Sequence, residues 1–364
     1  MINSKIAIAY FGNYPPLYTR VRTTLKGLRK NNISIYECWS DYPWLWLRLM
    51  ILAIKYLRVA SKINLLMVSE GGQAYVPLAK ILSKLTKKTL LFDAFLSYYH
   101  VKAIDTKAIK SDSLKGRYYF YLDKKSCELA DLVLLDTDEH INYFCRTFGL
   151  TKSKFQSLPV GSDDEWFYPM QKENNTRSDT FVVFLVASFY PLHGVEYVVR
   201  AAKILENQPQ IKFVLVGNGP MRKTTERLAN SLALKNMRFR DSIPPYQLPY
   251  LMKEADVCLG QFGITEHTQL VVPAKVYDAI AMAKPVITGD TKAVKAVFTD
   301  QENIILCPVA NPEALADKIL LLKKNPALKE KISQNGYRVF QEKFTPAKTG
   351  ANLAVIIQKM VKDR

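Results

Sequence analysis

Lys275 and Asp278 stand three residues apart in the segment VVPAKVYDAIAMA (271–283). The proline and the spacing of the apolar residues predict a helix with both charged residues on one face of its first turn. A cation at that place suits a diphosphate, and a carboxylate suits the two hydroxyls of a ribose. The alternative is a surface ion pair, because the helix dipole favours an aspartate at a helix start in any case.

Two loops with glycines could bring backbone N–H groups to the same ligand. His193 and Gly194 lie between an apolar run and the helical pattern VEYVVRAAKIL, and the start of a helix attracts anions. The segment FVLVGNGP ends in Gly217 and Gly219, which allow close approach of the backbone to a ligand. Each loop alone is weak support, because any turn from a strand into a helix needs similar residues.

Other cofactor chemistries have less support. The sequence holds no Walker motif, no complete G-x-G-x-x-G and no acidic residue placed to bind a Rossmann ribose, which disfavours ATP and NAD. Its five cysteines are scattered without a CxxC pair. This pattern argues against a disulfide framework or a zinc site and favours a reducing cytoplasm. We therefore expect no metal and no cofactor.

The elements that must position these residues alternate between short apolar strands and longer helical patterns. Nearly continuous apolar strands separated by helices are typical of parallel, doubly wound α/β sheets. The predicted strands lie in segments 5–12, 33–39, 63–70, 89–96, 131–138, 180–189, 211–219, 237–243, 256–262, 284–290 and 303–309.

One polar stretch without strands, QKENNTRSDT (171–180), interrupts this alternation. It predicts a linker between two α/β domains of comparable size. Ligands of such sheets bind at the carboxyl ends of the strands, so the expected site is a central cleft that the two domains face. The expected divisions are a domain over 1–168, a linker over 169–179, a domain over 180–346 and a C-terminal helix over 347–364.

The charge of the chain points to an anionic partner. Of 364 residues, 51 are Lys or Arg and 33 are Asp or Glu, and both halves share the net charge of +18. Nucleic acid, phosphate-bearing substrates and acidic membranes all fit this charge, but no nucleic-acid-binding motif accompanies it. No uncharged apolar run reaches the roughly 18–20 residues of a spanning helix, and the N-terminus lacks the features of a signal peptide. We expect a cytoplasmic protein without a nucleic-acid partner.

The segment PWLWLRLMILAIKYLRVASK (43–62) stands apart from the other helical patterns. On a helix its cations form one narrow stripe, and apolar residues cover the rest. One interpretation is a helix at an anionic membrane surface, at the inner face of the plasma membrane; the other is a domain helix buried on most sides. The residues expected to face a membrane are Trp44, Trp46, Arg48, Lys55 and Arg58.

Several segments in order resemble the family 4 retaining glycosyltransferases, which have the GT-B fold and belong to the glycosyl transferases group 1. The C-terminal half carries the resemblance through PLHGVEYVVRAAKIL, FVLVGNGP, ADVCLGQFG and VPAKVYDAIAMAKPVITGD. The N-terminal half is similar through AYFGNY, GGQAYVPLAK, LLFDAFLSYY, LDKKSCELADLVLLDT and LPVGSDD. Single segments are loose matches, whereas the ordered set is specific.

The resemblance implies a metal-independent hexosyltransferase. Its C-terminal domain would hold a nucleotide-sugar donor, and its N-terminal domain the acceptor. The helical segment 43–62 and the positive charge favour a glycan or lipid-linked acceptor, in cell-envelope or surface-glycan assembly. The C-terminal helix is expected to pack towards the N-terminal domain.

The family's site residues carry over by position. Asp278 occupies the position of the second glutamate of the family's E-x7-E motif, the residue that binds the ribose. His193 occupies the position of the lysine that usually binds the diphosphate. Lys275 is the cation expected to neutralise the departing diphosphate. Gly217 and Gly219 fall in the nucleotide-facing loop, Gly194 opens the helix after His193, and Gly12 matches the first-domain glycine loop near the donor phosphate. Asp93 lies close to the position at which many members of the family carry a catalytic-site histidine, and it is expected to orient the acceptor.

Three positions depart from the family's pattern. Leu270 replaces the first glutamate of E-x7-E, Lys295 stands where a further glutamate often occurs, and Ser188 replaces the usual arginine. Glu266, in the loop before Leu270, could contact the sugar instead. The changes at Leu270 and Lys295 keep open the alternative of a non-catalytic GT-B-like subunit that binds nucleotide or glycan. A nucleotide-sugar epimerase with the same fold is a further alternative.

Overall fold

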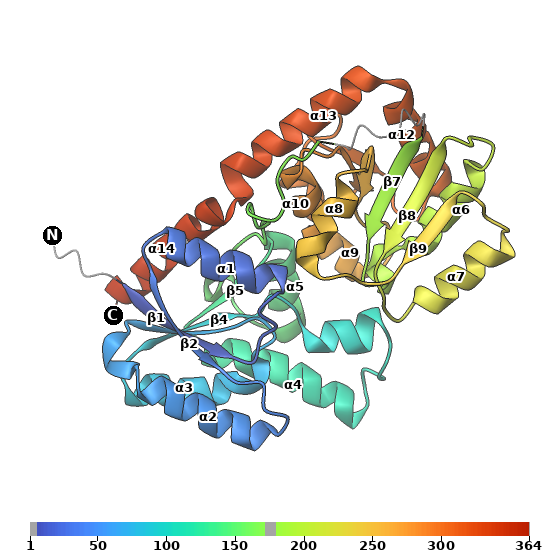
Figure 1. Ribbon diagram of the computed structural model, residues 1–364. Coiled ribbons are helices and arrows are strands. Elements are labelled where there is room, and N and C mark those ends of the chain that lie inside the picture. Colours follow the sequence, from blue (N-terminus) through green and yellow to red (C-terminus); the bar gives the residue numbers. More distant parts are fainter. Residues whose placement is uncertain (1–5, 172–179, 364) are drawn as a thin grey trace. The chain divides into compact units, whose positions relative to one another are not determined.

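The computed structural model describes residues 6–171 and 180–363 (Figure 1). The chain forms two compact units: Met1–Gly161 with Phe344–Arg364, and Ser162–Lys343. Each unit has its own six-stranded parallel sheet. Residues 172–179, most of the expected linker, lie outside the described residues.

The first sheet has the strand order β2-β1-β3-β4-β5-β6, with every neighbouring pair parallel. Its strands are β1 (Ala7–Gly12), β2 (Ser34–Trp39), β3 (Leu65–Val68), β4 (Thr89–Asp93), β5 (Leu132–Leu135) and β6 (Phe155–Ser157). The fully buried residues of β1, β3 and most of β4 explain the continuous apolar runs in the sequence. β6 is not predicted from the sequence, because its three residues include only one apolar side chain.

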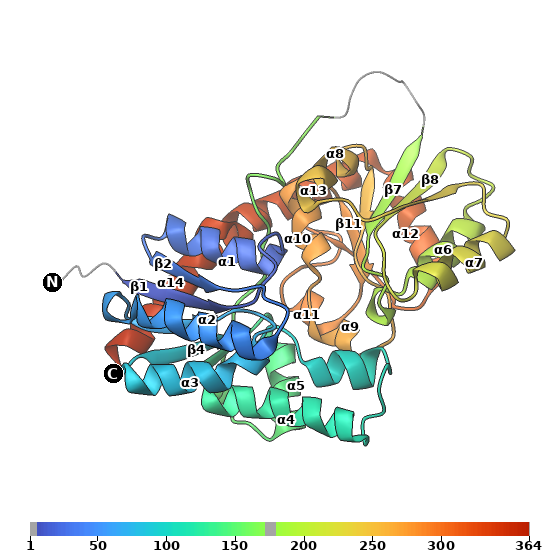
Figure 2. The same cartoon turned by 60° about the horizontal axis from the view of Figure 1, so that its bottom comes forward.

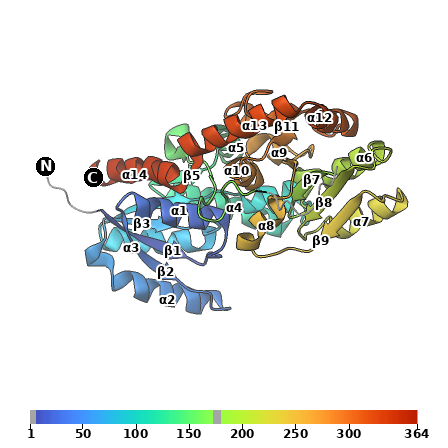
Figure 3. The ribbon, with the colours of Figure 1, turned by 45° about the horizontal axis from the view of Figure 1, so that its top comes forward.

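Helices cover both faces of this sheet. On one face lie α1 (Thr19–Lys30) and α14 (Pro346–Lys362), side by side; on the other lie α2 (Leu45–Leu57) and α3 (Val76–Leu85) (Figures 2 and 3). The unit also contains α4 (Leu114–Leu129) and α5 (Asp138–Phe148). The core beneath α1 and α14 is formed by buried apolar residues of both helices and of the central strands.

Two glycines set the close packing of α1 against α14. A Cβ added to Gly27 would lie 2.9 Å from the Cα of Gly350, and one added to Gly350 would collide with the backbone of Gly27. The helix backbones therefore approach more closely than side chains would allow. This contact brings the C-terminal helix into the first unit.

The second sheet has the order β12-β11-β10-β7-β8-β9, again with parallel neighbours. Its strands are β7 (Phe181–Val186), β8 (Ile211–Val216), β9 (Met237–Arg240), β10 (Val257–Leu259), β11 (Val286–Gly289) and β12 (Ile305–Cys307). Its helices are α6 (Val195–Ile204), α7 (Arg222–Ser231), α8 (Leu248–Met252), α9 (Glu266–Leu270), α10 (Ala274–Ala281), α11 (Lys292–Lys295), α12 (Pro312–Lys324) and α13 (Pro326–Val339). The predicted doubly wound α/β class is confirmed in both units.

Both sheets reverse their direction of strand addition beside their first strand. In the second unit the reversal lies between β7 and β10, and in the first between β1 and β3. The loops that follow these strands diverge at the carboxyl edge and leave a crevice where ligands of such sheets bind. Each unit therefore has one topologically defined place for a ligand.

Candidate functional site

The loops after β7 and β10 meet at the switch point of the second sheet. The carbonyl oxygen of His193 accepts a hydrogen bond from the backbone N–H of Phe262 at 3.0 Å, and that of Leu192 from Gly263 at 3.1 Å. Gly194 has a φ of +60°, and a Cβ there would collide with the backbone of Phe262 and Gly263. The glycine is thus required by the contact between the two loops, independently of any ligand.

Lys275 and His193 are buried beside one another at this switch point. Neither Lys275 Nζ nor His193 Nδ1 has a hydrogen-bond partner among the described residues. Burial lowers the pKa of Lys275 to about 7. Burial, and after it the charges of Lys275 and His267, hold the pKa of His193 well below its usual value. An anion would supply the counter-charge that these two groups lack.

Asp278 lies one turn further along α10 and is also buried. The Ser162 hydroxyl donates a hydrogen bond of 2.6 Å to its Oδ1 and so fixes the orientation of the carboxylate. Because Lys275 and Asp278 are only 9% and 6% exposed, the surface ion pair considered from the sequence is excluded.

The loop of Gly217 and Gly219 is held by Arg222 at the start of α7. The Arg222 guanidinium donates to the carbonyl oxygen of Gly217 at 2.6 Å and lies over the Phe189 ring, 5.1 Å from its centre. A Cβ on Gly217 or Gly219 would collide with the backbone of the loop after β7. These glycines therefore allow the loops after β7 and β8 to pack backbone against backbone. Arg222 is not predicted from the sequence, because its partners lie on other elements.

Glu266 is exposed at the start of α9, whereas Leu270 is buried. The segment between them is fixed by Gln261, which sequence analysis did not single out. The buried Gln261 Nε2 donates to the carbonyl oxygens of Thr268 at 3.0 Å and Val271 at 3.2 Å. The sequence feature that could have indicated Gln261 is its position directly after an apolar strand. The role of Glu266 towards a sugar stays a prediction.

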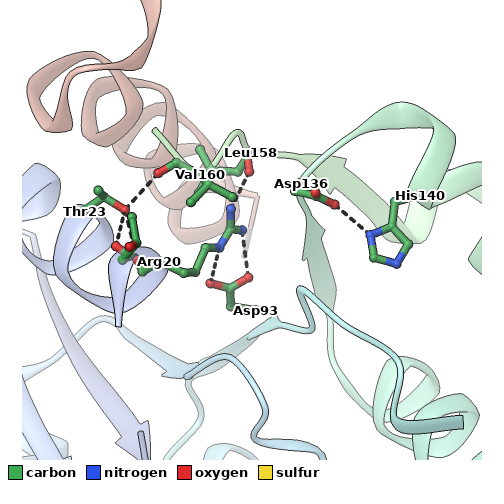
Figure 4. A network of polar contacts seen from close by, with 8 residues as sticks. Arg20, Thr23, Asp93, Asp136, His140, Leu158 and Val160 are labelled. Carbon is green, nitrogen blue, oxygen red and sulfur yellow. Dashed lines mark hydrogen bonds and ion pairs between the residues drawn. The ribbon is translucent and has the colours of Figure 1, made fainter. Parts of the chain in front are cut away.

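In the first unit, Asp93 ends β4 in a buried ion pair with Arg20 (Figure 4). Arg20 Nε and Nη2 donate to the two carboxylate oxygens at 3.0 and 2.8 Å, and Nη1 donates to the carbonyl oxygen of Leu158 at 2.5 Å. Asp93 is fully buried, so its charge is balanced inside the unit. Its expected role towards an acceptor stays a prediction. Gly12 ends β1 at the same edge, with a φ of +145°.

The residues expected to face a membrane fall into two groups. Trp44 and Trp46, at the start of α2, are 61% and 67% exposed, and Arg58, after its end, is also exposed. Arg48 and Lys55 instead make contacts within the first unit. Arg48 donates to the Tyr42 carbonyl and the Tyr75 hydroxyl, and Lys55 donates to the Trp39 carbonyl at 2.7 Å.

Neither a membrane-crossing helix nor a metal cluster occurs within residues 6–171 and 180–363. No helix there combines the length and the apolar character that crossing a bilayer requires. No group of three or more His, Cys, Asp or Glu side chains is placed there to hold a metal ion.

Comparisons with known proteins match part of this chain to a family. Residues 169–339 match the family described as Glycosyl transferases group 1. The alpha-D-kanosaminyltransferase of Streptomyces kanamyceticus is 23% identical over 190 residues, 52% of this chain and 48% of that protein. The lipopolysaccharide core biosynthesis glycosyltransferase LpsD of Rhizobium meliloti is 25% identical over 171 residues, 47% of each protein. The chain thus spans about half the length of these curated relatives.

A solved structure extends the similarity over both units. The crystal structure of Anabaena HepE in complex with UDP-glucose matches with a TM-score of 0.72 at 14% sequence identity, covering 97% of this chain and 100% of that one. At this low sequence identity, the similarity shows a common fold and nothing more. The chain therefore has the GT-B fold, and its residues 169–339 match the glycosyl transferases group 1 family.

Proposed function

We propose that this protein is a family 4 retaining glycosyltransferase that moves a hexosyl group from a nucleotide diphosphate to a glycan or lipid-linked acceptor. The observation that carries the proposal is the buried Lys275, without a hydrogen-bond partner among the described residues, at the switch point of the second sheet. HepE, with the same fold, binds UDP-glucose, and relatives such as LpsD act in glycan assembly. We propose the same broad setting, cell-envelope or surface-glycan assembly in the cytoplasm, for this chain.

In this proposal the second unit stabilises the departing diphosphate. The bond between the anomeric carbon and the diphosphate oxygen breaks, and the acceptor oxygen bonds to that carbon on the same face. The acceptor proton passes to the leaving phosphate. Protonated Lys275 and the N–H groups at the start of α6 neutralise the negative charge that develops there. Asp278, oriented by Ser162, binds the ribose hydroxyls, and no metal ion or cofactor is needed.

We also propose that the first unit contacts an anionic membrane through an apolar face of α2. Trp46, Met50, Ile54 and Leu57 recur at helical spacing and are 67%, 49%, 44% and 55% exposed. On α3, Ile81 and Leu85 are also exposed. Exposed Lys55, Arg58 and Lys84 flank these side chains. Apolar residues bordered by cations suit the headgroup region of anionic lipid, where a lipid-linked acceptor would be found.

A binding and turnover assay with UDP- and GDP-sugars tests the proposed activity. We expect one nucleotide to bind and Lys275→Met to weaken its binding at least about tenfold, because a charge-assisted contact is lost. Lys295→Met is the matched control, since Lys295 is exposed and pairs with Asp290 at the surface.

Three results would contradict the transferase proposal. Nucleotide binding without turnover, even with membrane extract as acceptor, would identify a non-catalytic subunit, which the leucine at position 270 motivates. A changed nucleotide sugar without acceptor would identify an epimerase. If the chain bound no nucleotide, the proposed donor site itself would be contradicted.

A further inference from the structure

The switch point of the first sheet holds a carboxyl group that the proposed reaction does not yet use. β1 ends at Gly12, and Ser69 and Glu70 follow β3. A Cβ added to Gly12 would lie 2.5 Å from Ser69 Oγ, so the two loops are in contact. Glu70 therefore lies where the loops of this sheet diverge, the place at which such sheets bind ligands.

Glu70 is buried without a compensating partner. It is 7% exposed, and its carboxyl group accepts no hydrogen bond and joins no ion pair among the described residues. The nearby Arg20 pairs its charge with Asp93 and also donates a hydrogen bond to the Leu158 carbonyl oxygen. The carboxylate oxygens of Glu70 are not among the fully buried polar atoms that lack a partner, so they reach the surface, where a ligand can meet them.

Two further polar groups at this edge also lack partners. The Tyr10 hydroxyl and Ser69 Oγ are buried and make no hydrogen bond with any described residue. Tyr10 lies within electrostatic reach of Glu70, which contributes, after burial and Asp93, to raising its pKa. The hydroxyls of Tyr10 and Ser69 and the carboxyl group of Glu70 are thus available to hydrogen-bond a polar ligand.

Aromatic rings surround this polar cluster. The pKa values of Tyr18 and Tyr98 are raised mainly by burial and next by Glu70, which places both phenols near its carboxyl group. The Tyr18 ring packs edge-on against Phe95, which lies two residues after β4 and has a strained φ of +51°. Aromatic rings suit the C–H faces of a sugar, while carboxylates accept hydrogen bonds from its hydroxyls.

We propose that the first unit binds an uncharged sugar or polyol ring of the acceptor at this switch point, with Glu70 accepting a hydrogen bond from a ring hydroxyl. The proposal rests on the proposed function and narrows its acceptor class. A phosphate or carboxylate on that ring is disfavoured, because it would meet a buried carboxyl group whose neighbouring cation is already paired.

The charge state of Glu70 gives the proposal a distinctive signature. Burial, and then the charge of Asp93, raise the pKa of Glu70 to about 7, against the opposing effect of Arg20. A protonated carboxyl group is a poorer acceptor, so sugar binding should strengthen as the pH rises from 6 to 8. Arg20 and Asp93, which are also near Glu70, form an ion pair. The phenols of Tyr10, Tyr18 and Tyr98 stay neutral over this range, because their pKa values are raised. Asp136 pairs with His140.

Direct binding measured by saturation-transfer NMR on the full chain tests this inference without a donor. The probes are methyl glycosides of glucose, galactose, mannose and N-acetylglucosamine, each paired with its 6-phosphate. We expect at least one neutral glycoside to bind and its 6-phosphate to bind at least about tenfold more weakly. Glu70→Gln should weaken binding about tenfold and abolish its dependence on pH, whereas Glu128→Gln, on an exposed helix face, should change neither.

The outcomes separate this inference from the proposed function. UDP or GDP binding without any glycoside binding, or stronger binding of a 6-phosphate, would overturn the acceptor proposal and leave the donor site intact. If the unmodified chain bound neither UDP nor GDP, the proposed donor site would be contradicted instead. Should Glu70→Gln fail to fold by circular dichroism, Tyr10→Phe removes one unpartnered hydroxyl and should weaken the same glycoside. Unchanged binding in that variant would contradict the site.

Discussion

Lys275 illustrates how burial sets the chemistry of one side chain. An exposed lysine is protonated at every physiological pH, whereas burial lowers the pKa of Lys275 to about 7. The protonated form of Lys275 is then disfavoured when no anion is bound and stabilised by a bound anion. Diphosphate binding should therefore be coupled to proton uptake.

This coupling can be measured by calorimetry of UDP or GDP binding in buffers with different ionisation enthalpies. At pH 8 free Lys275 is mostly neutral, and the anion raises its pKa, so we expect uptake approaching one proton. At pH 6 the lysine is already protonated, and uptake should be much smaller. Lys275→Met should abolish the difference between the two pH values, whereas Lys295→Met should retain it. Equal uptake at both pH values would contradict a buried neutral lysine.

The site residues that could be predicted from the sequence are those that share one element. Lys275 and Asp278 lie on the same helix turn, so their spacing alone placed them together. The roles of Gln261 and Glu70 depend on neighbours in other elements. For Gln261 these are α9 and the residue that follows it, and for Glu70 the Arg20–Asp93 pair. Periodicity carries no information about such contacts.

At the scale of elements, the contact of α1 with α14 depends on the absence of two side chains. Gly350→Ala should destabilise the first unit by roughly 2–3 kcal/mol, because its Cβ would meet the backbone of Gly27 and force the helices apart. Val355→Ala, at an exposed position of the same helix, should change stability by less than about 0.5 kcal/mol.

Hydrogen exchange followed by peptide provides the measurement for this helix pair. We expect Gly350→Ala to accelerate exchange in α1 and α14 and to leave α6 and α12, in the second unit, unchanged. If α1 and α14 exchanged as slowly in the variant as in the unmodified chain, close backbone contact would not be what holds them.

At the scale of the whole molecule, the net charge of +18 and the apolar face of α2 should act together on anionic membranes. We expect co-sedimentation with vesicles containing phosphatidylglycerol, weakened several-fold when salt is raised from 0.1 to 0.5 M, because exposed charges are screened. Replacing Trp46 and Leu57 with Ala should weaken binding about tenfold, or ~1.4 kcal/mol.

Leu114→Ala is the matched control, because Leu114 is 87% exposed in the same unit but lies at the start of α4. If co-sedimentation with the vesicles changed neither with salt nor with the α2 substitutions, the proposed membrane contact would be contradicted. Sensitivity to salt alone would show that charge acts without insertion of the apolar face.

The sequence by itself determined the fold class, most strands and the helix of Lys275 and Asp278, because apolar periodicity and turn residues act over a few neighbouring positions. Only the tertiary structure decided which groups are buried and what they meet. It showed that Asp93 is paired with Arg20, that Glu70 is not paired, and that α2 exposes an apolar row rather than a continuous basic stripe. Burial and charge compensation depend on contacts between elements distant in the chain, which no local pattern records.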